Sequence, residues 1–137
     1  MSDIKHRLLL VDDSPTDIRF NLENLKHEYL VVAANGGLRA IEMLETMSAL
    51  PDVILMDVEM PDQNGYQTCE IIKKNPNWQH IEVIFVSGHN SPQEKLAGYD
   101  AGGSDYIIKP YNSDELKQKI RLAIHNNERQ RKLADNQ

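Results

Sequence analysis

Five short apolar runs, each followed by a polar or charged residue, restrict the fold of this sequence more than any other feature. The runs lie at residues 8–11, 30–34, 53–56, 81–86 and 106–108. Short runs without alternation between apolar and polar positions are typical of strands covered on both faces. They predict a sheet that lies inside the molecule.

The segments between the runs have the spacing of amphipathic helices. Ser14-Pro15 and Ser91-Pro92 each pair an N-cap residue with a proline suited to the first turn, and Asn112 with Glu115 has capping-box spacing. The expected buried faces comprise Ile18, Leu22, Leu25, Tyr29, Leu38, Ile41, Leu44, Tyr66, Cys69, Ile72, Leu96, Tyr99 or Ala101, Leu116, Ile120 and Ile124. Alternating strands and helices predict right-handed crossovers and a parallel sheet with helices on both faces.

The composition fits one soluble domain. The chain has 137 residues, and 40% of them are hydrophobic, which is enough for one buried core. Its 21 acidic and 15 basic side chains give a net charge of −6, whereas a nucleic-acid surface would be basic. The single cysteine, Cys69, gives no sign of an oxidising compartment. Without a signal-peptide or membrane-helix pattern, we expect a cytoplasmic protein that binds neither nucleic acid nor membrane directly.

Polar residues that follow the predicted strands suggest a site. They are Asp12-Asp13 after the first strand, Asp57 after the third, Ser87 after the fourth and Lys109-Pro110 after the fifth. The carboxyl ends of parallel strands meet at one edge of a sheet, where open α/β sheets bind ligands. Three carboxylates placed together repel one another, and a divalent cation relieves that repulsion. Oxygen ligands without a neighbouring His or Cys cluster favour Mg²⁺.

The same residue types suit phosphoryl transfer. A carboxylate such as Asp57 can act as a nucleophile and form an aspartyl phosphate. The ammonium of Lys109 and the hydroxyl of Ser87 would then neutralise and bind phosphoryl oxygens. The sequence has no Gly-rich P-loop, so a nucleotide is not the expected direct ligand.

Taken together, these motifs resemble the receiver domain family of two-component response regulators. The resemblance covers residues 5 to about 125 and rests on Leu9-Leu10-Val11-Asp12-Asp13, Ile54-Leu55-Met56-Asp57-Val58-Glu59-Met60-Pro61, Gly65, Val86-Ser87 and Asp105-Tyr106-Ile107-Ile108-Lys109-Pro110. It implies a flavodoxin-like, doubly wound sheet of five parallel strands in order 2-1-3-4-5. The sequence departs from the common family pattern at Gly88 and Gly103-Ser104, which lie in loops and carry no charge.

The resemblance also implies the roles of the acidic residues. Asp57 would accept a phosphoryl group from a histidine kinase or phosphotransfer protein. Asp13, Asp57 and the backbone carbonyl of Glu59 would bind Mg²⁺ or Mn²⁺, and Asp12 would assist through a water molecule. The residues two positions after Asp57 and Ser87, which are Glu59 and His89, would flank the water that removes the phosphoryl group.

The remaining family residues would form a switch. Lys109 would pair with the phosphoryl group, and Pro110 would follow a cis peptide bond. Ser87 would move toward the phosphoryl group while the ring of Tyr106 turns inward. The surface of the fourth helix, fifth strand and fifth helix would then change its preference for an output domain, a second receiver in a homodimer, or a target protein.

Two other functions compete with this interpretation. A phosphatase of the haloacid dehalogenase type also uses an aspartyl nucleophile, a lysine and Mg²⁺, but it carries a second Asp where this chain has Glu59, and its nucleophile follows the first strand. A degenerate receiver would bind partners without phosphorylation, which the complete set of acidic and basic residues disfavours. We expect residues 1–125 to form the domain, and residues 126–137 to be a charged helical extension or the start of a linker.

Overall fold

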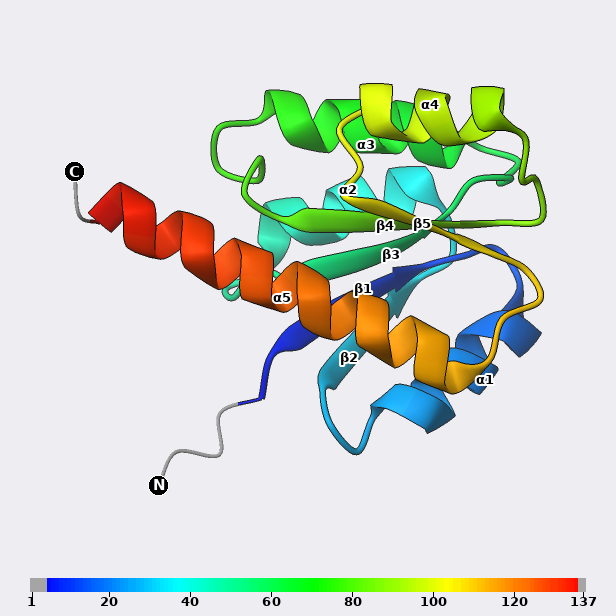
Figure 1. The fold of residues 1–137 in the computed structure, drawn as a ribbon, viewed down its shortest axis with the longest axis horizontal. Coiled ribbons are helices and arrows are strands. Elements are labelled where there is room, and N and C mark those ends of the chain that lie inside the picture. Colours follow the sequence, from blue (N-terminus) through cyan, green and yellow to red (C-terminus); the bar gives the residue numbers. More distant parts are fainter. Residues whose placement is uncertain (1–4, 136–137) are drawn as a thin grey trace.

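Five strands alternate with five helices in the computed structural model, which describes residues 5–135 (Figure 1). The strands are β1 (Arg7–Val11), β2 (Leu30–Ala34), β3 (Val53–Asp57), β4 (Glu82–Ser87) and β5 (Asp105–Ile108). The helices are α1 (Pro15–Leu25), α2 (Gly37–Thr46), α3 (Gly65–Lys74), α4 (Pro92–Asp100) and α5 (Ser113–Asp135). Within this part of the chain, no helix is both long and apolar enough to cross a membrane.

All neighbouring strands are parallel, and their order is β2-β1-β3-β4-β5. This order confirms the predicted flavodoxin-like sheet. The register pairs Val11 with Met56, Asp57 with Val86, and Ser87 with Ile108. The polar residues at the carboxyl ends of β1, β3, β4 and β5 therefore meet at one edge.

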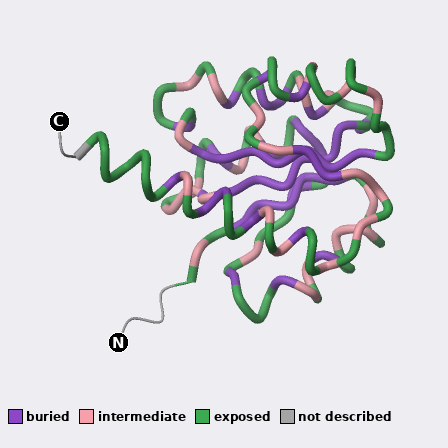
Figure 2. The backbone as a smooth tube through the Cα atoms, viewed as in Figure 1, coloured by how far each residue is buried: buried purple, intermediate pink, exposed green. Residues whose placement is uncertain are grey.

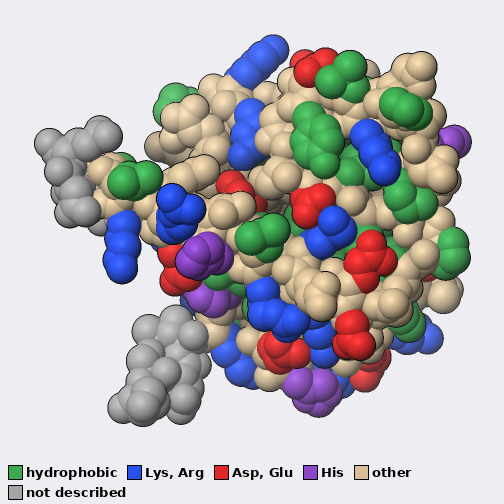
Figure 3. Space-filling view, in the orientation of Figure 1, with side chains coloured by type: hydrophobic (Ala, Val, Ile, Leu, Met, Phe, Trp, Pro, Cys, Tyr) green, Lys and Arg blue, Asp and Glu red, His purple; other side chains and the backbone are tan. Residues whose placement is uncertain are grey.

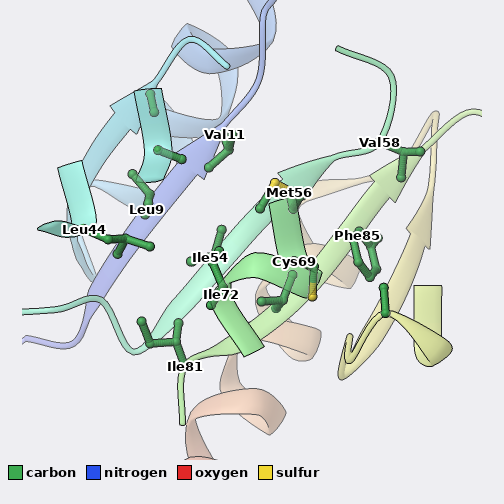
Figure 4. Packing of buried hydrophobic residues seen from close by; sticks show 14 of the residues in the cluster. Leu9, Val11, Leu44, Ile54, Met56, Val58, Cys69, Ile72, Ile81 and Phe85 are labelled. Carbon is green, nitrogen blue, oxygen red and sulfur yellow. The ribbon is translucent and has the colours of Figure 1, made fainter. Parts of the chain in front are cut away.

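Two hydrophobic clusters cover the two faces of the sheet. Strands β1, β3 and β4 are buried along most of their length, and the ends of β5 are half-buried (Figure 2). The prediction that every strand is covered on both faces was wrong for β2, which lies at the edge of the sheet and has only Ala34 buried. On one face, Leu9, Ile54 and Phe85 pack with residues of α2 and α3 such as Cys69 and Ile72 (Figure 4). On the other face, alternate strand residues pack with α1 and α5. Because successive strand side chains point to opposite faces, continuous apolar runs were needed to fill both clusters.

The helices begin where the capping residues predict. The hydroxyls of Ser14 and Ser91 accept hydrogen bonds from backbone N–H groups at the third helical position, and Asn112 accepts one from Glu115 at 2.7 Å. A capping box that the sequence analysis missed joins Asn64 and Gln67 at the start of α3. Each cap satisfies a backbone N–H that has no partner inside its helix.

Several residues expected on buried helix faces lie elsewhere. Leu38 is 53% exposed and Leu96 is 59% exposed, and Tyr99 is also exposed, whereas Ala101 is buried. Helix α4 packs through Gly98, where an added Cβ would lie 3.0 Å from the Phe85 ring and 3.1 Å from the Tyr106 ring. The approach of two aromatic rings to this glycine, not the position of the large apolar residues, decides which side of α4 faces the sheet.

Helix α5 continues into the tail that was expected to be an extension or a linker. Asn127 is buried and its side-chain amide donates a 2.7 Å hydrogen bond to the carbonyl of His80. The next residues of the helix, from Glu128 to Ala134, are exposed. Asn136 and Gln137, the end of that predicted tail, lie outside the described residues.

Candidate functional site

Three carboxylates meet at the carboxyl edge of the sheet. Asp12, Asp13 and Asp57 each offer a carboxylate oxygen, and these oxygens lie within 4.8 Å of one another. Asp12 and Asp57 are buried, while Asp13 is exposed. The structure thus brings together the acidic residues that the sequence placed after two different strands.

Backbone hydrogen bonds hold the first two acids in a tight connection between β1 and α1. The N–H of Asp12 donates to the carbonyl of Ala34 at 3.1 Å, which extends the pairing of β1 with β2 by one residue. The N–H of Ser14 then donates to Asp12 Oδ1 at 2.9 Å and turns the chain toward the helix. Asp12 is thereby oriented inward, and Asp13 faces solvent.

The third acid is fixed by the loop that follows β3. The N–H of Val58 donates to the carbonyl of Val86 at 3.2 Å, and the N–H of Gly65 donates back to the carbonyl of Val58 at 2.9 Å. A Cβ at Gly65 would collide with the carbonyl of Asp57. Only glycine allows the start of α3 to pack this closely behind the acid.

The far end of that loop is tied to α2 by Asp62, a contact that the sequence analysis missed. Gly36 stands at the N-cap position of α2 and has no side chain to cap the helix. The Asp62 carboxylate accepts a hydrogen bond from the N–H of Leu38 at 3.0 Å and supplies that cap from another segment. An isolated Asp in a loop gave no signal for this contact.

The two buried acids, Asp57 and Asp12, are poorly solvated, and this changes their pKa values. Burial, followed by the charge of Asp12, raises the pKa of Asp57 to about 7, although the ammonium of Lys109 opposes the change. Burial also raises the pKa of Asp12. A divalent cation would stabilise the ionised forms, and an all-oxygen donor set of three carboxylates suits Mg²⁺. The residues present therefore fit the predicted metal.

Lys109 is shared between two carboxylates. Its Nζ lies 3.5 Å from Asp57 Oδ1 and 3.3 Å from Asp17 Oδ2. Burial alone would lower the pKa of Lys109, but the neighbouring carboxylates outweigh that effect and raise it. Asp17 was not among the predicted site residues, because an acid in the first turn of a helix usually serves to stabilise that helix by interacting with its dipole. The Lys109–Pro110 peptide bond is cis.

The hydroxyl of Ser87 is fully buried and has two partners. It donates to the carboxylate of Glu59, with Oγ 3.0 Å from Oε1, and it accepts from the N–H of His89 at 3.0 Å. The His89 ring closes the group, with Nε2 3.3 Å from Glu59 Oε1. The side-chain contact between Glu59 and Ser87 was not predicted, because the two residues lie 28 positions apart and no local pattern links them.

The ring of Tyr106 is buried and belongs to a second polar group. Its hydroxyl lies 3.0 Å from that of Tyr66, which in turn lies 3.0 Å from both the backbone carbonyl and Oε2 of Glu94. Phe85 packs against both tyrosine rings, with centroids 5.1 and 6.1 Å away. Because a phenol has one proton, Tyr106 donates to Tyr66 when Tyr66 donates to Glu94. Tyr66 links α4 to the predicted switch residue, although its sequence position indicated only packing.

An open hollow of about 670 Å³ lies beside the two polar groups and Asp13. Its lining comprises Asp13, Val58, Glu59, Met60, Pro61, Asn64, Tyr66, His89 and Glu94. Of the three clustered acids, the exposed Asp13 contributes to this lining. Acidic and basic side chains are interspersed on the face of the molecule that carries α5, so this face shows no patch of a single charge (Figure 3).

Comparison with known proteins identifies the family. The family model of the response regulator receiver domain matches residues 8–121. A probable cyclic di-GMP phosphodiesterase of Vibrio cholerae is 36% identical over 119 residues, which are 87% of this chain and 26% of that protein. The response regulator PleD of Caulobacter vibrioides is 33% identical over 116 residues, which are 84% of this chain and 25% of that protein. The chain thus spans about a quarter of the length of these two relatives.

Solved structures agree with this match. A CheY-like response regulator receiver domain protein of Methanospirillum hungatei has a TM-score of 0.84 and 26% identity, and the match covers 93% of this chain and 99% of that one. The receiver domain of a putative Luxo repressor protein of Vibrio parahaemolyticus has a TM-score of 0.85 and 25% identity, covering 95% and 98%. This chain belongs to the receiver domain family of two-component response regulators. The family is a signalling family, and membership implies a phosphorylation-dependent function rather than the phosphatase alternative.

Proposed function

We propose that Asp57 is the phosphoacceptor of a cytoplasmic, Mg²⁺-dependent signalling switch, and that a histidine kinase or a phosphotransfer protein supplies the phosphoryl group. One observation carries this proposal. The buried Asp57 carboxylate lies both within 4.8 Å of the Asp12 and Asp13 oxygens and 3.5 Å from Lys109 Nζ. The three carboxylates provide the negative charge that would bind a cation beside Asp57. The ammonium of Lys109 provides the positive charge that would bind a phosphoryl group on Asp57.

The chemistry is a transfer between two nucleophiles. An oxygen of Asp57 attacks phosphorus, a P–O bond forms, and the P–N bond to the donor imidazole breaks with its electron pair going to nitrogen. Asp13, Asp57 and the backbone carbonyl of Glu59 would hold Mg²⁺ or Mn²⁺, with Asp12 assisting through water. The cation, when bound, supplies charge neutralisation at the phosphoryl oxygens. Lys109 contributes a second positive charge from the carboxyl end of β5.

Ser87 and Tyr106 are the residues that would convert the new charge into a change of surface. A phosphoryl group adds roughly two negative charges and three acceptor oxygens. The Ser87 hydroxyl would exchange Glu59 for one of those oxygens. Tyr106 is hydrogen bonded to Tyr66 and through it to α4. If the Tyr106 ring turns inward when Ser87 moves, the hydrogen bond to Tyr66 would carry the change to the α4–β5–α5 surface, where an output domain, a target or a second receiver would bind.

Mass spectrometry of the intact protein tests the acceptor assignment. The protein is incubated with Mg²⁺ and acetyl phosphate, and Asp57→Asn is treated in parallel. We expect a gain of one phosphoryl group in the original protein, no gain in Asp57→Asn, and no gain after chelation of the metal. Asp114→Asn, which removes an acid from the first turn of α5, is the matched control. An equal gain in Asp57→Asn would show that another residue accepts the group.

A further inference from the structure

The ammonium of Lys109 lies between a carboxylate inside the site and one outside it. Asp57 Oδ1 is 3.5 Å from Nζ and Asp17 Oδ2 is 3.3 Å from it. Charge-assisted N–H to carboxylate contacts are usually about 2.7 to 2.9 Å long. Both the Lys109–Asp57 and the Lys109–Asp17 distances are longer than this, as expected when one ammonium group interacts with two carboxylates at once.

Asp17 is held in this place by the start of α1. Its backbone N–H donates to the capping hydroxyl of Ser14 at 3.3 Å, which fixes the first turn of the helix. The loop from β5 to α5 runs beside that turn (Figure 1). The Asp17 carboxylate thus meets Lys109 across a gap of 92 residues in sequence.

The surroundings of the two carboxylates differ. The side chain of Asp57 is 6% exposed, that of Lys109 is 33% exposed and that of Asp17 is 44% exposed. A cavity of about 230 Å³, lined by Asp17, Phe20, Lys109, Pro110 and Tyr111, lies on the outer side of the ammonium. Lys109 therefore has open space on the side that it shares with Asp17.

We propose that Asp17 is a positioning residue that draws Lys109 away from Asp57 and so weakens the binding of a phosphoryl group. This inference rests on the proposed function of Asp57. When a phosphoryl group is attached there, the ammonium gains a doubly charged partner and Asp17 loses its own. The Asp17–Lys109 pair thus favours the form without the phosphoryl group. The charge of Asp17 also repels an incoming anion, so both effects act in the same direction.

The size of the effect follows from the exposure of the pair. Partly exposed ion pairs contribute up to about 1 kcal/mol, which corresponds to a change of about two- to fivefold in an equilibrium constant. Asp17→Asn keeps the shape of the side chain and removes its charge. Asp17→Glu keeps the charge. Glu23→Gln removes one negative charge from the same helix, and Glu23 pairs with Lys26 rather than with Lys109.

Two measurements compare these variants. One is the rate of phosphorylation by acetyl phosphate over a range of donor concentrations, and the other is the affinity for beryllofluoride at equilibrium, both in Mg²⁺. We expect Asp17→Asn to bind beryllofluoride about two- to fivefold more tightly and to reach half-maximal rate at a lower donor concentration. Asp17→Glu and Glu23→Gln should match the original protein. The difference should shrink at high ionic strength, because salt screens exposed charges.

Other results would overturn the inference. Equal changes in Asp17→Asn and Glu23→Gln would mean that only net charge matters. A less stable Asp17→Asn with unchanged beryllofluoride affinity would mean that Asp17 only supports the helix end. Asp17→Ser provides a second neutral variant if the first does not fold. If the original protein gains no phosphoryl group, the proposed function fails; if it gains one and the neutral variants behave identically to it, only the role of Asp17 fails.

Discussion

The Ser87 hydroxyl donates a hydrogen bond to the carboxylate of Glu59, with Oγ 3.0 Å from Oε1. Ser87 is the last residue of β4, and Glu59 lies in the loop that follows Asp57 at the end of β3. A serine hydroxyl has one proton to donate. Ser87 must therefore give up Glu59 before it can donate to a phosphoryl oxygen.

Removal of the Glu59 carboxylate should consequently favour phosphoryl binding. A hydrogen bond to a charged group contributes about 1.5 to 3 kcal/mol, part of which is recovered when Ser87 finds a new acceptor. We expect Glu59→Ala to bind beryllofluoride about three- to tenfold more tightly, as measured by titration in Mg²⁺. In a Ser87→Ala background the same change should have little effect. A full effect in that background would assign it to the charge of Glu59 rather than to the hydrogen bond.

The stability of the protein should depend on pH through Asp57. Burial among the acids raises its pKa to about 7 from a usual value of 3.8. Between these values the folded protein keeps a proton that the unfolded chain has lost, so the free energy of unfolding falls as the pH rises. The change is of the order of 2 to 4 kcal/mol by pH 8. Urea unfolding at pH 5 and pH 8 should show this loss in the original protein and a smaller loss in Asp57→Asn, in which the raised pKa of Asp12 remains.

Magnesium should reverse this loss. At pH 8 the carboxylates are ionised and a cation relieves their repulsion, whereas at pH 5 binding must displace protons. Added Mg²⁺ should raise the urea midpoint markedly at pH 8 and much less at pH 5. A metal effect that is the same at both pH values would indicate that Mg²⁺ binds away from Asp57.

The hydroxyl pair of Tyr66 and Tyr106 should stabilise the packing of α4. Tyr66→Phe leaves the Tyr106 hydroxyl without its partner, and such a loss costs about 1 to 2 kcal/mol. Removing both hydroxyls should cost less than removing that of Tyr66 alone, since the buried Tyr106 hydroxyl is then no longer left unpaired and Glu94, the other partner of Tyr66, lines the open hollow. Urea unfolding of the single and double phenylalanine variants measures the difference. Tyr99→Phe, which alters an exposed tyrosine of α4, is the control and should leave stability unchanged.

Gly65 should be intolerant of a side chain. A Cβ there would collide with the Asp57 carbonyl and lie 3.0 Å from Met56 Cγ. Overpacking of this kind costs about 1 to 3 kcal/mol. Gly65→Ala should therefore lower the free energy of unfolding and slow phosphorylation by acetyl phosphate, since Asp57 must shift. Gly88→Ala is the matched control, because a Cβ at that position meets nothing within 4 Å. Equal stability of the two alanine variants would contradict the packing argument.

The architecture and the central residues followed from sequence alone for a physical reason. Apolar runs buried on both faces require a parallel sheet covered by helices, and parallel strands end at a common edge. Asp12, Asp57, Ser87 and Lys109 each follow or end such a strand, so their meeting was a consequence of topology. The capping residues Ser14 and Ser91 marked helix starts because their hydrogen bonds are local.

Contacts between side chains on different elements were decided by the tertiary structure. Asp17 meets Lys109, Tyr66 meets Tyr106, and Glu59 meets Ser87, across separations of 92, 40 and 28 residues. Their meeting depends on helix rotation and side-chain packing, which no local pattern encodes. Helix α4 is the clearest case: Leu96 suggested one buried face, but two aromatic rings need the space at Gly98. Local patterns determine which elements form, whereas close packing between them determines which side chains touch.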